Sequence, residues 1–152
     1  MDIRIEEVLG CTCLRMRRAT RRITQIYDHA LAPAGVTVNQ FGLMAHLYGA
    51  SLAGRPGFAI HVLAVRLGAD PTTLNRTLRP LQENGLIRNV GDPSDRRVRL
   101  VQLTDKGRRE LAKVMPLWRA AQAQVEKSLG QKSLRELNEL LDFAAAKLEP
   151  GQ

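Results

Sequence analysis

Hydrophobic positions in the middle of the chain repeat at helical spacing in two short segments separated by a tight turn. The first segment has its apolar residues on one helical face: Ile60, Leu63, Ala64 and Leu67. The second segment repeats the pattern with Leu74, Leu78 and Leu81. Gly68 ends the first helix, Asp70 is a good N-cap for the second, and Pro71 suits its first turn. The pattern predicts a helix-turn-helix whose second helix covers residues 70–81.

Polar side chains of this second helix fall outside its apolar face. They are Thr72, Thr73, Asn75, Arg76 and Arg79. Hydroxyl, amide and guanidinium groups on a surface with few acids suit base edges and phosphates better than plain solvation. We interpret residues 70–81 as a DNA-recognition helix.

Two short strands follow, at Leu86–Val90 and Arg99–Leu103, with a turn-rich loop between them. A helix-turn-helix followed by a two-stranded hairpin is a winged helix. Arg96 and Arg97 lie near the tip of the hairpin, where arginine suits the negative potential of a minor groove. The alternative is an exposed basic hairpin with no role in DNA binding.

Apolar repeats at both ends of the chain predict long helices. One covers residues 6–31, and another section begins at Thr104, with a capping box at Ser133–Glu136 opening the last helix. A further capping box at Thr37–Gln40 opens a helix that runs until Gly49. The apolar faces of the terminal helices must be buried against other helices, and those of a second chain in a symmetric dimer would serve. Such a dimer would also place its two recognition helices on the two halves of a palindromic site. The fold class is therefore mainly α, with a small β-hairpin wing.

Composition agrees with a polyanion as partner. The 152 residues carry 23 basic and 15 acidic side chains, for a net charge of +8. The N-terminus has no apolar core of a signal peptide, and no apolar run is long enough to span a membrane. We expect a cytoplasmic protein in which Cys11 and Cys13 start out reduced.

The order of elements resembles the MarR family of bacterial transcription regulators over nearly the whole chain. Four motifs carry the resemblance: Thr73–Arg76 in the recognition helix, Asn84–Ile87 after it, Asp92–Arg97 in the wing, and Leu103–Gly107 at the strand-to-helix junction. The resemblance implies a homodimer that binds short palindromic operators in double-stranded DNA, usually as a repressor released by a small ligand or by oxidation. It also implies a helical dimerisation domain at residues 1–36 and 105–152 around a DNA-binding domain at residues 37–104.

The resemblance further assigns roles to the DNA-binding residues. Thr72, Thr73, Asn75 and Arg76 would face the major groove, and Arg79 could contact a phosphate. Asp95 would orient the wing relative to the helix by ion pairing, and Arg97 would reach the minor groove. Pro80 departs from the commoner family residue and removes one backbone hydrogen bond late in the helix.

A ligand pocket is expected where the terminal helices meet the winged helix. By resemblance its walls would draw on Arg15, Tyr27, Phe41, Met44, His46, Met115 and Trp118. An apolar slot with one arginine favours an aromatic carboxylate or a phenol. Each of these residues taken singly also suits a place in the core.

Oxidation of Cys13 is the alternative signal. Cys13 lies 14 residues before Tyr27, which resembles the hydroperoxide-sensing branch of the family, but Val38 stands where a second tyrosine is expected. Nearby arginines would favour the thiolate, whereas helix cysteines also serve as small apolar packers.

Other functional classes fit the sequence less well. Cys11 and Cys13 with His29 or His46 lack the spacing of a four-ligand metal site, so no metal or cofactor is expected. A thiol peroxidase or reductase would need a base near these cysteines or a cofactor loop, so we expect no enzyme. A winged helix that binds protein would not require the charge of Arg76 and Arg79.

Overall fold

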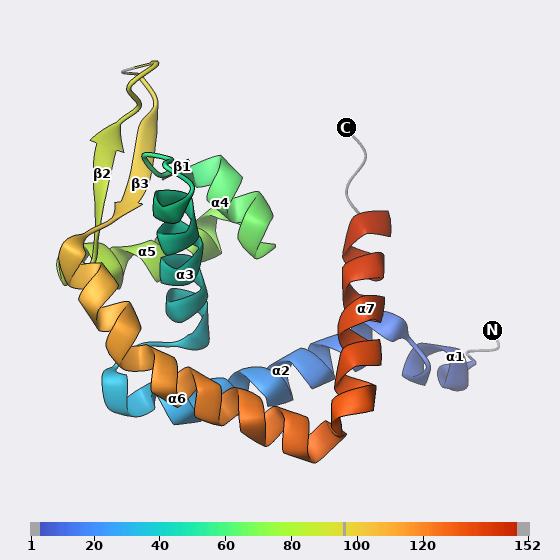
Figure 1. The fold of residues 1–152 in the computed structure, drawn as a ribbon. Coiled ribbons are helices and arrows are strands. Elements are labelled where there is room, and N and C mark those ends of the chain that lie inside the picture. The colour runs from blue at the N-terminus through green and yellow to red at the C-terminus, as the bar shows by residue number, and fades with distance from the viewer. Residues whose placement is uncertain (1–3, 96, 149–152) are drawn as a thin grey trace. The chain divides into compact units, whose positions relative to one another are not determined.

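The computed structural model of the chain describes residues 4–95 and 97–148. Its elements, in chain order, are α1 (Ile5–Leu9), α2 (Thr12–Leu31), a 3₁₀ turn η1 (Ala32–Ala34), α3 (Val38–Leu52), β1 (Phe58–Ala59), α4 (Ile60–Leu67), α5 (Pro71–Glu83), β2 (Ile87–Gly91), β3 (Arg99–Leu103), α6 (Asp105–Leu129) and α7 (Gln131–Lys147) (Figure 1). None of the described helices combines the length and apolar character that crossing a bilayer requires.

The chain divides into two compact units. One runs Tyr27–Trp118, and the other combines the two ends of the chain, up to Ile26 and from Arg119 onward. The last turn of α2 and the first half of α6 therefore belong to the middle unit, together with the whole winged helix.

The middle unit is a winged helix with a three-stranded antiparallel sheet in the order β1-β3-β2. β3 is the central strand, and its Val101 lies opposite both Phe58 of β1 and Asn89 of β2. Figure 1 shows β2 and β3 extending as a long hairpin away from the helices. The core is formed by apolar side chains of α3, α4, α5, the sheet and the start of α6, among which Leu43, Met44 and Leu63 are fully buried. This core fixes the orientation of α5 relative to the wing.

Local chemistry explains where α3 begins. Thr37 and Gln40 form the expected capping box, with the Gln40 amide donating to Thr37 Oγ1 at 3.2 Å and the Thr37 amide donating to Gln40 Oε1 at 2.9 Å. The Val38 amide donates to Asp28 Oδ1 at 2.7 Å, so a carboxylate of α2 also satisfies the start of α3.

The end unit contains α1, most of α2, the second half of α6, and α7. Its buried apolar side chains among the described residues are Ala121 and Val125. Many of its larger apolar side chains are exposed: Ile5, Val8, Leu9, Leu14, Met16, Leu129, Leu140, Leu141, Phe143 and Leu148. Most of the exposed large apolar side chains among the described residues therefore belong to this unit.

The structure corrects several boundaries that the sequence pattern predicts. The helix expected over residues 6–31 is interrupted at Gly10 and Cys11, because glycine is a poor helix former. The helix expected to end at Gly49 continues to Leu52, since Ala50 packs into the core. The capping box at Ser133 was wrong: α7 starts at Gln131, directly after Gly130 at a φ of 80°.

Candidate nucleic-acid interface

Helix α5 presents one buried and one exposed face. Leu74, Leu78 and Leu81 are between 1% and 3% exposed, so the helix cannot rotate without unpacking the core. On the opposite side, Thr72, Thr73, Asn75, Arg76 and Arg79 are exposed, as the sequence predicts. The apolar face thus holds the polar side chains in a fixed direction.

Asp70 caps the helix through two hydrogen bonds. Its carboxylate accepts from the Thr73 hydroxyl at 2.5 Å and from the Thr73 amide at 3.0 Å. These bonds lower the pKa of Asp70, with the hydroxyl contributing most. Because the Thr73 hydroxyl donates its proton to Asp70, it can only accept from a base edge, whereas Thr72, Asn75 and Arg76 keep exposed donors.

Arg79 lies one turn from the end of α5 and is paired. Its Nε donates to Glu83 Oε1 at 2.8 Å, and this bond raises the pKa of Arg79. Both side chains are largely exposed, so solvent screens the pair and a phosphate could compete with Glu83 for the guanidinium.

The loop of the wing is held together by two carboxylates. Asp92 Oδ1 accepts from the amide and the hydroxyl of Ser94, at 2.7 and 2.6 Å. Asp95 accepts from the Arg97 amide at 3.0 Å and from the Arg97 guanidinium at 3.1 and 3.2 Å. These bonds lower the pKa of Asp92 and of Asp95. The bonds shown for Asp95 thus lie inside the wing, and they fix Arg97, whose side chain is 91% exposed.

Two arginines of the wing strands extend this basic surface and were not expected. Arg88 and Arg99 are exposed on β2 and β3, and Arg88 Nε donates to Gln102 Oε1 on the neighbouring strand at 2.9 Å. Their outward positions in the alternating strand pattern could have indicated them. Arg96, the other wing arginine that the sequence singles out, lies outside the described residues.

The wing is joined to the recognition helix by a tightly packed turn. Thr104 Oγ1 donates to Gly85 O at 2.7 Å and accepts from the Gly107 amide at 3.0 Å, so it also caps α6 as predicted. Lys106 Nζ donates to Asn84 O at 2.8 Å. A Cβ at Gly107 would lie 2.1 Å from Leu86 O, so only glycine fits there. These contacts connect the end of α5 to the base of the wing.

Comparison with known proteins agrees with this geometry. Residues 60–107 match a family model described as a winged helix DNA-binding domain. The transcriptional regulator MosR of M. tuberculosis is 37% identical, with a TM-score of 0.72 over 90% of this chain and 96% of MosR. The transcriptional repressor CouR, solved bound to a 23-mer DNA duplex, is 27% identical, with a TM-score of 0.76 over 95% and 99% of the two chains. A mutant of MarR from E. coli, solved with operator DNA, shares the fold at 21% identity and a TM-score of 0.77, over 98% and 100%.

The chain belongs to the MarR family. It is a DNA-binding transcriptional regulator of the MarR type, built as a mainly helical protein with a small antiparallel sheet. The matched proteins are regulators rather than enzymes.

The residues expected to line a MarR-type ligand pocket do not all come together. Phe41 stacks on Trp118 with ring centroids 5.8 Å apart, and Tyr27 lies 6.5 Å from the same indole. Burial raises the pKa of Tyr27. Met44 is fully buried in the core, and Met115 packs partly buried against it.

Two of the expected pocket residues lie elsewhere. His46 is exposed and lines a separate hollow with Arg55 and Arg66. Arg15 belongs to the end unit, where it borders an apolar hollow of about 320 Å³ together with Arg18 and Arg22. Of the seven residues, Phe41, Met44, Met115 and Trp118 therefore share one core cluster, Tyr27 lies against its Trp118, and Arg15 and His46 have different surroundings.

The two cysteines are free thiols in different environments. Cys11 is half-buried in the break between α1 and α2, whereas Cys13 is exposed on α2. Cys13 lines an open hollow of the end unit with Arg17 and Arg21. No group of three or more histidine, cysteine or acidic side chains that could hold a metal ion occurs among the described residues.

Proposed function

We propose that this MarR-family protein is a homodimeric repressor that binds a palindromic operator. Each protomer would place α5 in the major groove and its wing in the adjacent minor groove. The proposal rests on helix α5, which is capped by Asp70 and packed into the core by its leucine face. This packing leaves Thr72, Asn75 and Arg76 exposed on the opposite side of the helix. Arg97, fixed by Asp95 at the end of the hairpin, supplies the cation that a minor groove attracts.

The homodimer is supported by the end unit. Its apolar side chains are exposed on α1, α2 and α7, with Leu9 68%, Phe143 61% and Leu148 74% exposed. Several large apolar side chains exposed on one unit favour a protein interface, and a second copy would cover the same helices by symmetry.

Selection of bound sequences from a random DNA library tests the proposal. We expect an inverted repeat whose half-sites are centred about one helical turn, roughly 10 base pairs, apart. Light scattering of the purified protein should give twice the mass of the chain. Enrichment of a single unrepeated site would contradict the homodimer, as would one protein chain per DNA in the complex. A selection that enriches no sequence would contradict specific DNA binding.

For the releasing signal we propose a small aromatic or phenolic ligand. The cluster of Tyr27, Phe41 and Trp118 supports this class, because it combines stacking surfaces with one half-buried hydroxyl. CouR from Rhodococcus jostii RHA1, which shares the fold at 22% identity, was solved bound to p-coumaroyl-CoA. Release of the selected DNA by a panel of aromatic acids and phenols, lost in a Trp118→Ala variant, is the expected result.

A thiol signal is the second candidate, and a different observation favours it. Cys13 is a free, exposed thiol that lines an open hollow with Arg17 and Arg21. Oxidation of this thiol by a hydroperoxide would give a sulfenic acid and an alcohol. Mass spectrometry of the peroxide-treated protein, together with its DNA binding, separates the two signals.

A further inference from the structure

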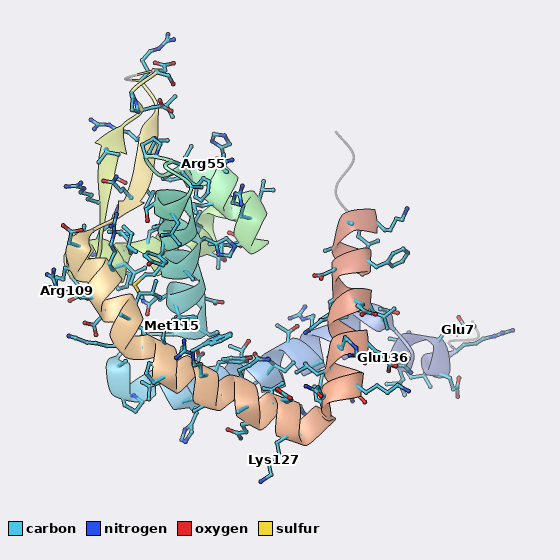
Figure 2. The ribbon with its side chains drawn as sticks, viewed as in Figure 1. Glu7, Arg55, Arg109, Met115, Lys127 and Glu136 are labelled. Atoms are coloured by element: carbon cyan, nitrogen blue, oxygen red, sulfur yellow. The ribbon has the colours of Figure 1, made fainter. Side chains whose placement is uncertain are left out.

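A hollow of about 470 Å³ lies on the middle unit, and none of the residues assigned to DNA lines it. It is formed by the second half of α3, the following loop, β1 and α4, and no residue of α5 or of the wing loop lines it. Three of its side chains carry nitrogen donors: His46, Arg55 and Arg66. No acidic side chain lines it. Figure 2 shows Arg55 next to β1, at the end of α3.

Arg66 is held in place by an aromatic ring. Its guanidinium carbon lies 4.5 Å from the centroid of Phe58, which is itself only 8% exposed. Stacking leaves the N–H groups at the edge of the guanidinium plane, where they can donate to an oxyanion. Within the described part of the chain, Arg66 has neither an ion pair nor a hydrogen bond from its guanidinium.

Arg55 sits in a loop whose backbone is fixed at two glycines. Gly54 has a φ of 68° and Gly57 a φ of 144°, both in the region that favours glycine. A Cβ at Gly57 would lie 2.3 Å from Val101 O, so this end of the loop is pressed against β3. The Arg55 amide donates to Ala50 O at 2.9 Å. The described residues provide no acidic partner for its guanidinium either.

His46 and the small residues of α3 complete the hollow. His46 Nδ1 donates to Gly42 O at 2.8 Å, which fixes the ring and leaves Nε2 as its second polar atom. Ala45 and Gly49 of α3 and Ala53, which directly follows the helix, line the hollow at spacings of four and leave room above the helix. The result is a hollow with an apolar floor, one guanidinium group stacked on Phe58 and a second on a loop whose backbone is held.

We propose that this hollow is a binding site for a compact organic dianion, such as a small phosphomonoester or dicarboxylate. Two guanidinium groups match the charge and the oxygens of a dianion, and bidentate donation is the geometry in which arginine binds such groups best. The apolar floor contacts the carbon part of the ligand. The proposal does not depend on the operator or on the dimer, because all of its residues belong to the middle unit of one chain.

Calorimetric titration of the full-length protein with phenyl phosphate tests the site, with phenol as the uncharged control ligand. Phenyl phosphate should bind and phenol should not. Arg55→Gln and Arg66→Gln should each raise Kd by about tenfold, because each removes charged hydrogen bonds to the anion. Arg109→Gln, at an exposed position of α6 outside the hollow, should leave Kd unchanged (Figure 2).

A variant that changes no charge tests the shape of the site separately. A Cβ at Gly49 meets nothing within 4 Å, so both Gly49→Ala and Gly49→Leu should fold. Gly49→Leu should fill the hollow and remove binding, whereas Gly49→Ala should bind phenyl phosphate within about twofold of the parent.

Four outcomes would overturn the proposal. Equal binding of phenol would show that the guanidinium groups are not used. Unchanged binding in the Gly49→Leu variant, or an equal loss in Arg109→Gln, would show that phenyl phosphate associates with surface charge elsewhere. Intact phenyl phosphate binding in Arg55→Gln and Arg66→Gln, combined with weaker DNA binding and a smaller salt dependence, would make this surface a contact for DNA phosphates instead.

Discussion

Replacing Gly107 by alanine tests whether the packed turn between α5 and the wing determines the stability of the middle unit. The added Cβ would lie 2.1 Å from Leu86 O and 2.7 Å from Leu103 Cδ1. The Leu103 side chain can shift, but Leu86 O is held, because it accepts from the Thr104 amide at 3.0 Å. The Leu86 amide is held as well, at 2.8 Å from Leu81 O. Relief of the clash therefore requires movement of α6, the wing or the end of α5.

Overpacking of this kind lowers the free energy of unfolding by about 1–3 kcal/mol. Because the Leu86 carbonyl is held by a hydrogen bond, we expect a cost near the upper end, about 3 kcal/mol. Alanine regains up to about 1 kcal/mol in a helix, because it has a higher helix propensity than glycine. The net expectation is a loss of about 2 kcal/mol in the free energy of unfolding. Urea titration followed by far-UV circular dichroism measures it from the midpoint, provided that the denaturant slope is unchanged.

Gly42→Ala is the matched control. Gly42 lies inside α3, and a Cβ there meets nothing within 4 Å. The same substitution should therefore stabilise the protein by about 0.5–1 kcal/mol. If Gly107→Ala proves as stable as the parent, or if both variants lose the same amount, the turn at Leu86 and Gly107 does not set the stability and our reasoning fails.

Four further outcomes are expected. Arg76→Ala should weaken binding to the selected operator by about 1–3 kcal/mol and relax its sequence preference, as gel-shift competition would measure; an equal loss on every DNA would make Arg76 a phosphate contact. DNA affinity should fall steeply between about 50 and 200 mM salt, and a flat dependence would argue against phosphate neutralisation. The pKa values of Asp70 and Asp95 are lowered in the folded state, so the stability that these carboxylates contribute is present above the ordinary carboxyl pKa and is lost as the pH falls through the folded values. Asp95→Asn should therefore make the melting temperature less sensitive to acid. An unchanged pH profile of the melting temperature would contradict the role of Asp95. Cys13→Ser should keep peroxide from releasing DNA if the thiol is the sensor, and unchanged release would exclude Cys13.

The winged helix could be predicted from the sequence because its determinants are local. Asp70, Pro71 and the leucine repeat that includes Leu74 define the start and the buried face of α5 within a few residues of each other. The strand at Arg99–Leu103 was predicted with its correct bounds for the same reason. The exposure of the predicted DNA-facing side chains followed directly, since a helix with one buried face must expose the other.

What the sequence pattern missed depends on contacts between distant segments. β1 has only two residues and exists because Phe58 and Ala59 pair with β3, some forty residues later. The commitment of the Thr73 hydroxyl to Asp70 is a choice of rotamer that spacing does not encode. His46 was assigned to the aromatic slot with Phe41, yet its ring is turned by its bond to Gly42 O and lines another hollow.

The two units differ in how much apolar core each buries within one chain. This difference determines where a signal can act. The middle unit buries a core from α3, α4, α5 and the sheet, so the shape of its reading surface is set by one chain. The end unit buries Ala121 and Val125 among its described residues, while Leu140, Phe143 and Leu148 stay exposed. Burying a leucine or phenylalanine side chain contributes about 1.5–3 kcal/mol, so a second copy covering such residues would supply much of the stability of this unit. In the proposed dimer, the distance between two α5 helices would then be set by the unit with the smaller internal core. An oxidised Cys13 in the end unit would need to change only the packing between copies, and would leave each winged helix intact while weakening its fit to the operator.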